Sequence, residues 1–174
     1  MARNPLHLVS TVLAAGALSL AAAPLASCGF TPLYAEPGVT PGLSSIQVVA
    51  PEGRVGYLLR ESLDDALAHR PGAPAAWRLD LAMDQSREPL GLRIDDVARR
   101  YQVTLTVQYA LVDTATGQVT HRGQATSFAS YDLADQPYAA IAARQDVQQR
   151  AAEEVARKIQ MDLATYFVAR NRGG

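Results

Sequence analysis

Strict alternation of apolar and polar residues over 101–112 is the feature that most constrains the fold of this chain. The stretch YQVTLTVQYALV puts apolar side chains at every second position, and the positions between them are rich in Gln and Thr. This pattern is typical of a β-strand with one buried and one solvated face. The turn DTATGQ follows, and residues 118–130 predict an antiparallel return strand with Gly123 as a candidate β-bulge. The pattern therefore predicts a hairpin that needs a cover for one face.

Other periodic stretches supply that cover and extend the sheet. SIQVVA (45–50) and the alternating WRLDLAMDQ (77–85) predict two more strands. Residues 54–70 place Val55, Leu59 and Leu63 on one helical face, and an Ala-rich segment over about 136–170 repeats apolar residues at spacings near 3.6. The order β-α-β-β-β-α predicts an α+β two-layer sandwich, with a four-stranded, mainly antiparallel sheet and two helices on one face.

Residues 1–27 have the pattern of a secretory signal peptide. Arg3 gives a weakly basic start, and the run LVSTVLAAGALSLAAAPLA that follows is uncharged. A membrane-spanning helix is the alternative, but the run is Ala-rich, Pro24 interrupts it and no basic stop-transfer cluster follows. The pattern therefore favours an export signal.

Cys28 is the only cysteine of the chain. Leu25, Ala26 and Ser27 precede it, and this junction resembles the bacterial lipobox, in which the cysteine becomes the acylated first residue of the mature protein. A lone thiol cannot form a disulfide within the chain, so the cysteine count also favours lipidation. An ordinary export signal with an incidental Cys28 is the alternative. By the lipobox rule, Gly29 in place of an aspartate predicts the outer membrane, on the periplasmic side.

The mature chain divides into a tether and one domain. Residues 28–44 contain three prolines and three glycines, show no helical or strand period and predict a lipidated tether. Phe30, Leu33 and Tyr34 are apolar for a linker, so they are expected to contact the membrane interface, a partner or the domain itself. The domain is expected over 45–170 and a short tail over 171–174.

Composition and motifs exclude several classes of function. The formal net charge is −1, with Lys158 as the only lysine, so bulk binding of nucleic acid is not expected. HExxH, G-x-S-x-G and a phosphate-binding glycine loop are all missing from the sequence. The paired carboxylates are sequence neighbours, which diverge by about 100° on a helix. The chain is therefore not expected to be an enzyme, nor to hold a cofactor or metal.

The opening of the mature chain, CGFTPLYA (28–35), resembles the lipopolysaccharide-assembly lipoproteins of the LptE family. The likeness continues through GRVGYLLRESLDDAL (53–67), residues 95–119 and VARKIQMDLATYF (155–167). It implies two helices on a four-stranded sheet. It also implies a lipoprotein that plugs the lumen of the outer-membrane β-barrel LptD, assists its assembly and takes part in delivering lipopolysaccharide to the surface.

Two surfaces of the predicted domain suit that role. The polar sheet face, with Gln102, Thr104, Thr106 and Gln108 beside Arg78 and Asp80, suits a hydrated lumen wall, although a solvent-exposed face has the same composition. The stretch SREPLGLRIDDVARRY (86–101) mixes arginines with apolar residues, which suits an amphiphilic anion. Arg93, Arg99 and Arg100 are the candidate contacts to the phosphates of lipid A. Pairing of these arginines with Glu88, Asp95 and Asp96, in an ordinary strand connection, is the alternative.

A second class of protein has a similar organisation. The auxiliary lipoprotein of a lipid-transporting ABC system is also a tethered α/β domain behind a lipobox. It would lack the CGFTPLY opening, and its partner would be a transporter or shuttle instead of a barrel.

Overall fold

The computed structural model describes residues 38–90, 100–133 and 136–173. Within these ranges the elements are, in chain order, α2 (Val39–Ser44), β1 (Ile46–Val49), α3 (Arg54–Ala66), β2 (Trp77–Pro89), β3 (Arg100–Asp113), β4 (Val119–Asp132) and α4 (Pro137–Arg172). The predicted α+β class is confirmed. Several boundaries differ from the prediction: β2 continues to Pro89, α3 ends at Ala66, and α4 continues into the expected C-terminal tail.

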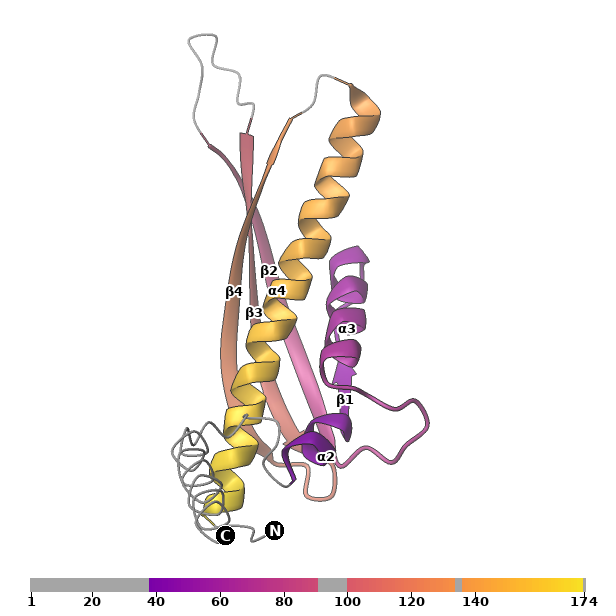
Figure 1. Ribbon diagram of the computed structural model, residues 1–174, viewed down its shortest axis with the longest axis vertical. Helices are drawn as coiled ribbons and strands as arrows, with labels where there is room; N and C mark the ends of the chain where they lie inside the picture. Colours follow the sequence, from indigo (N-terminus) through magenta and orange to yellow (C-terminus); the bar gives the residue numbers. More distant parts are fainter. Residues whose placement is uncertain (1–37, 91–99, 134–135, 174) are drawn as a thin grey trace, which may run out of the picture. The chain divides into compact units, whose positions relative to one another are not determined.

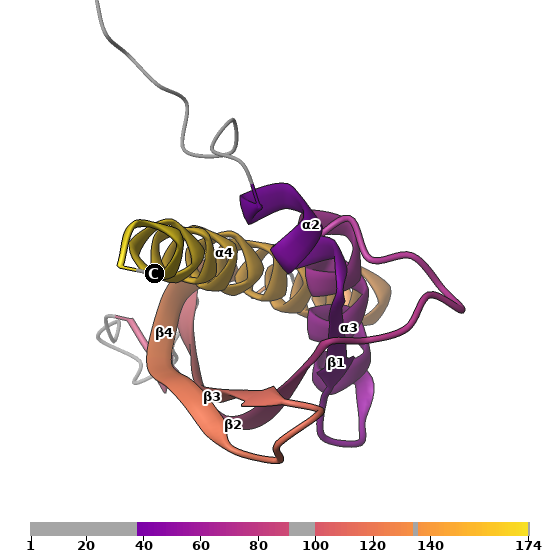
Figure 2. The same cartoon turned by 90° about the horizontal axis from the view of Figure 1, so that it is seen from below.

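The four strands form one mixed sheet in the order β1-β2-β3-β4. β1 pairs with β2 in parallel, and the β2–β3 and β3–β4 pairs are antiparallel. α3 connects the two parallel strands, and both long helices lie on the same face of the sheet (Figures 1 and 2). The predicted two-layer arrangement is therefore present.

The core lies between the sheet and these helices. The alternation over 101–111 turns one side chain in two toward α4, and Leu105, Val107 and Leu111 are almost fully buried. α3 contributes Leu59 and Leu63, which one helical turn separates. In the described part of the chain, every helix is too short or too polar to cross a membrane.

The prediction of an irregular tether through residue 44 is wrong at its C-terminal end, where α2 forms. Val39 and Leu43, one turn apart, are buried in the core. Pro41 lies in the first turn of α2, where backbone N–H groups have no acceptor within the helix. The missing N–H of proline therefore costs no helical hydrogen bond. Gly42 lets this helix approach α4, since a Cβ at this position would lie 3.1 Å from the Phe167 ring.

The predicted bulge at Gly123 is also wrong. Gly123 pairs in regular register with Tyr109, and the irregularity of the β3–β4 ladder falls between Leu111 and Val112. Glycine is required at this position for another reason. A Cβ at residue 123 would overlap the Tyr109 ring, which covers this position. An aromatic side chain that covers a cross-strand glycine helps to fix the strand register.

Candidate functional site

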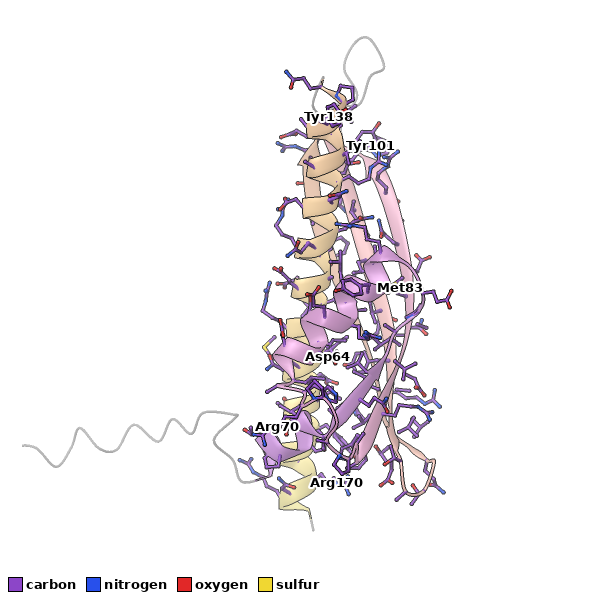
Figure 3. The ribbon with its side chains drawn as sticks, turned by 90° about the vertical axis from the view of Figure 1, so that its right-hand side faces the viewer. Asp64, Arg70, Met83, Tyr101, Tyr138 and Arg170 are labelled. Atoms are coloured by element: carbon purple, nitrogen blue, oxygen red, sulfur yellow. The ribbon has the colours of Figure 1, made fainter. Side chains whose placement is uncertain are left out.

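Three strands and the start of α4 meet at one end of the domain, which Figure 3 marks by Tyr101 and Tyr138, opposite Arg170. Here the rings of Tyr101 and Tyr131 stack at a centroid distance of 5.8 Å. The Arg87 guanidinium lies 4.6 Å from the Tyr101 ring centroid and donates a hydrogen bond of 3.3 Å to the Tyr131 hydroxyl. We call Arg87, Arg100, Tyr101, Tyr131 and Asp132 the tip cluster.

Arg100 is the one predicted lipid-contact residue within the described chain. Its Nε and Nη2 donate to the two carboxylate oxygens of Asp132, at 2.8 and 3.2 Å. This bidentate pair raises the pKa of Arg100 and lowers the pKa of Asp132, chiefly through the hydrogen bonds. The partner that the described residues show therefore comes from β4, a strand that the sequence alternative did not include. Arg93 and Arg99, like Asp95 and Asp96, lie outside the described residues.

Exposed apolar side chains surround the tip cluster. Leu90 directly follows β2, and Leu133 directly follows β4. Tyr138 and Ile141 lie in the first turns of α4. All four are exposed, and Tyr138 is 88% exposed. This end of the domain therefore combines cationic, aromatic and aliphatic groups, which can contact the phosphates and acyl chains of one amphiphile.

The outer face of the sheet is largely polar, although Val49 is exposed on β1. Thr106 and Thr126 lie on neighbouring strands, with their hydroxyl oxygens 3.2 Å apart. Arg78 and Asp80 form an exposed ion pair of 2.7 Å, so two of the predicted face residues neutralise each other. Phe128 departs from the pattern, because it is 68% exposed in the middle of β4. The face can form many hydrogen bonds and carries little net charge.

A polar network on the other face joins the sheet to α4. The Tyr109 hydroxyl donates to Asp162 Oδ2 at 2.6 Å, and His121 Nε2 lies 2.5 Å from the same oxygen. Burial, then the hydrogen bond to Asp162, raises the pKa of Tyr109 well above its ordinary value. The His121 ring also stacks on Tyr166. The network therefore holds α4 on the hairpin.

Metal binding finds no support in the described residues. The ranges 38–90, 100–133 and 136–173 contain no group of three His, Cys, Asp or Glu side chains that could hold an ion. Asp162 bonds Tyr109 and His121, and Asp132 bonds Arg100. These carboxylates therefore have structural partners.

Comparison with known protein families identifies the domain. The profile of the LptE family, described as lipopolysaccharide-assembly, matches residues 43–163. The chain belongs to the LptE family. A role in lipopolysaccharide assembly, and hence in the cell envelope, follows from this membership.

Solved structures of lipoproteins share the fold of this LptE-family domain. A "putative lipoprotein" from Caulobacter crescentus CB15 is 55% identical, with a TM-score of 0.68 over 76% of this chain and 97% of that chain. The minor lipoprotein from Acinetobacter baumannii shares the fold at 17% identity, with a TM-score of 0.51 over 70% of this chain and 89% of that chain. A search of curated proteins found no match.

Sequence reasoning singled out the polar sheet face and Arg100 of this LptE-family domain, and their role in binding stays a prediction. It did not predict the partners of Arg87 and Arg100. The β2–β3 register sets Pro89 opposite Tyr101, and the β3–β4 register sets Tyr101 opposite Tyr131. The stacked pair follows from the β3–β4 register, whereas the polar end of β2 shows no alternation from which to place Arg87 beside it. Cys28 lies outside the described residues, so its acylation stays a prediction.

Proposed function

We propose that this chain is a non-enzymatic outer-membrane lipoprotein, acylated on Cys28, that plugs an LptD-like β-barrel. In this role it helps to assemble the barrel and takes part in moving lipopolysaccharide to the cell surface. The match of the LptE family to residues 43–163 is the observation that carries the proposal. The geometry of the described domain adds two supporting arguments.

The first argument is the polarity of the outer sheet face. The interior of a transmembrane barrel is polar and hydrated, so a plug needs a surface that forms hydrogen bonds. Hydroxyl and amide groups supply such a surface on β3 and β4, where Thr106, Gln108 and Gln124 share one face. A face with little net charge avoids the cost of burying unpaired ions against the wall.

The second argument is the length of the domain. α4 has 36 residues, and at 1.5 Å per residue it is about 54 Å long. A bilayer with its headgroups measures about 40–45 Å. The described chain begins at Gly38, beside Asn171 near the end of α4 and far from the tip cluster. A protein anchored at Cys28 can therefore extend its tip across the thickness of the membrane.

We assign Arg93, Arg99 and Arg100 to the phosphates of lipid A, and the exposed apolar side chains of the tip to its acyl chains. A guanidinium can bind phosphate in a bidentate way, and charge-assisted hydrogen bonds are about twice as strong as neutral ones. Arg100 already shows this geometry with the Asp132 carboxylate. A phosphate can compete for the same donors, since the pair is exposed.

Affinity purification from the detergent-solubilised envelope tests the barrel assignment. The wild-type chain should retain a large outer-membrane barrel, whereas recovery of ABC transporter components would support the auxiliary lipoprotein of a transporter. Cys28→Ser should stop incorporation of labelled fatty acid. It should also release the chain from membranes or leave it unprocessed in the inner membrane. Failure of the wild-type chain to incorporate the label would contradict acylation.

A lipopolysaccharide-binding measurement tests the tip. In the mature chain with Cys28→Ser, replacing Arg93, Arg99 and Arg100 by Ala should weaken binding in a salt-sensitive way and keep co-purification with the barrel. The matched control replaces three arginines away from the tip, Arg54, Arg60 and Arg70. Equal affinities of the two folded triple variants at low salt would remove the tip from the mechanism.

A further inference from the structure

A hollow lies on the outer face of the sheet, the face that is turned away from α3 and α4 (Figure 2). It forms where two alanines, Ala82 on β2 and Ala110 on β3, stand among longer side chains. The outward side chains that line the hollow are those of Asp80, Ala82, Gln108, Ala110, Arg122 and Gln124. The two short side chains leave room for a group of another molecule to approach the sheet.

The strand register places polar side chains next to one another around this hollow. Gln108 on β3 pairs directly with Gln124 on β4, and Ala110, two residues along β3, pairs with Arg122. Side chains that lie directly opposite in an antiparallel pair have Cβ atoms about 4.5–5.5 Å apart. The guanidinium and the two amides can therefore all reach one group that is bound over Ala110.

Arg122 differs from the other arginines on the outer face of the described strands. Arg78 donates to both carboxylate oxygens of Asp80. Arg100 donates in the same way to Asp132. Arg122, in contrast, has no hydrogen-bond or ion-pair partner within residues 38–90, 100–133 and 136–173. The guanidinium that lines the hollow is therefore available to an anion from another molecule.

We propose that the hollow receives an acidic side chain, Asp or Glu, from the inner wall of the barrel partner, and that Arg122 binds its carboxylate. The proposal rests on the function proposed above, because a plug buries this face against the wall. A guanidinium that loses its water without gaining an anion weakens a complex strongly. A carboxylate avoids this loss, since it accepts two parallel hydrogen bonds from one guanidinium. The amides of Gln108 and Gln124 can donate to the same oxygens.

Substitution at Arg122 tests the sign of the charge on the wall. The side chain is exposed, so Arg122→Gln and Arg122→Glu should melt like wild type. After co-expression with the barrel, Arg122→Gln should lower the yield of co-purified barrel. Arg122→Glu should lower it further, by about tenfold from wild type, because two carboxylates then face each other. Arg122→Lys keeps the charge without the bidentate geometry and should retain more barrel than Arg122→Gln.

Ala110 offers a matched pair of variants inside the hollow. Ala110→Glu and Ala110→Gln fill it with side chains of nearly equal size, but only glutamate places a carboxylate directly opposite Arg122. Opposite charges at paired positions stabilise a sheet slightly, so the glutamate variant should fold. Ala110→Glu should recover about tenfold less barrel than Ala110→Gln, because its carboxylate neutralises Arg122 and repels the acidic side chain of the wall.

The outcomes separate this inference from the proposed function. Equal barrel yields for wild type and Arg122→Glu, or for the two Ala110 variants, overturn the acidic contact and leave the plug function standing. A higher yield for Arg122→Glu shows a basic wall and also overturns it. Failure of the wild-type chain to recover a barrel overturns the plug function itself.

A binding measurement with lipopolysaccharide covers the other anion that Arg122 could meet. In the mature chain with Cys28→Ser, Arg122→Glu should bind lipopolysaccharide as tightly as the chain with Arg122. Weaker lipopolysaccharide binding, together with a wild-type yield of barrel, would show that the hollow takes a phosphate of the lipid and would overturn the contact with the wall.

Discussion

The lower and upper parts of the domain share one sheet, but the helices cover more of the sheet in the lower part. In the lower part, which we define as residues 38–83, 105–127 and 151–173, α2, α3 and most of α4 pack against the strands. In the upper part, residues 84–90, 100–104, 128–133 and 136–150, β2, β3 and β4 extend beyond α3, and only the start of α4 covers them (Figure 1).

The buried side chains follow this division. The large core cluster lies almost wholly in the lower part, where Leu59, Leu79 and Ile159 are fully buried. The upper part has a separate cluster of three buried residues, Val103, Tyr131 and Val147. Apolar burial supplies most of the favourable free energy of folding, so the lower part should determine global stability. The tip cluster, by contrast, lies where local opening costs least.

The largest expected effect is a charge in the lower core. Ile159 is fully buried among apolar residues, so Ile159→Asp should unfold the domain. An unpaired buried charge costs several kcal/mol, against a total stability of about 5–15 kcal/mol. Val155→Asp should behave alike, and Met161→Asp is the control, since Met161 is 51% exposed on the same helix. Wild-type melting of both core variants, measured by circular dichroism, would contradict the assigned core face.

A smaller loss is expected from a single methyl group at Gly123. Gly123→Ala should cost about 2 kcal/mol, because the new Cβ collides with the Tyr109 ring and the core must shift. The loss should fall in a Tyr109→Leu background, where the ring is missing. Chemical denaturation of the four proteins in this double-mutant cycle measures the coupling. A loss that is the same in both backgrounds would show that Gly123 is required for another reason.

A matched pair on α4 compares the two parts most directly. Val155 in the lower part and Val147 in the upper part are both fully buried. Val155→Ala should cost about 2 kcal/mol and lower the global free energy of unfolding. Val147→Ala should cost about 1 kcal/mol, since the small upper cluster can collapse around the gap. In Val147→Ala, hydrogen exchange should become faster only in the upper strands. An equal decrease in the global free energy of unfolding for both variants would contradict the distinction between the two parts.

The lower part is also the part that the sequence predicted best. Apolar residues recur there at a period of two in β3 and 3.6 in α3 and α4, because each element has one buried face. The class, the order of the four strands and two long helices, and the core side of the sheet followed from these periods. β2 was predicted only to residue 85, because both faces of 84–89 are exposed and show no alternation.

What the sequence did not predict depends on contacts between distant residues. α2 is a short segment with two buried apolar residues, Val39 and Leu43. Their burial depends on the packing of α2 against α4 near Phe167. Asp132 is 32 positions from Arg100 and becomes its partner only through the β3–β4 register. A loop arginine with nearby acidic residues offers several partners in sequence, and strand pairing selects one of them.

The smallest effect is expected at the Arg100–Asp132 pair. Both side chains are exposed, and exposed ion pairs contribute little because water and salt screen them. The pair lowers the pKa of Asp132 below its ordinary value of 3.8. Its contribution is therefore present above about pH 4 and is lost as the pH falls through the lowered pKa.

Arg100→Gln should accordingly shift the melting temperature by at most about 1 °C at pH 7 and by less at pH 2. Lipopolysaccharide binding should weaken in the same variant, because Arg100 is exposed and can exchange the Asp132 carboxylate for a phosphate. Calorimetry at the two pH values, beside a binding measurement at pH 7, separates these effects. A fall of several degrees at pH 7 would show that the upper part depends on this pair for its stability. The limited cover that α4 gives to the upper strands would then not account for the stability of the upper part.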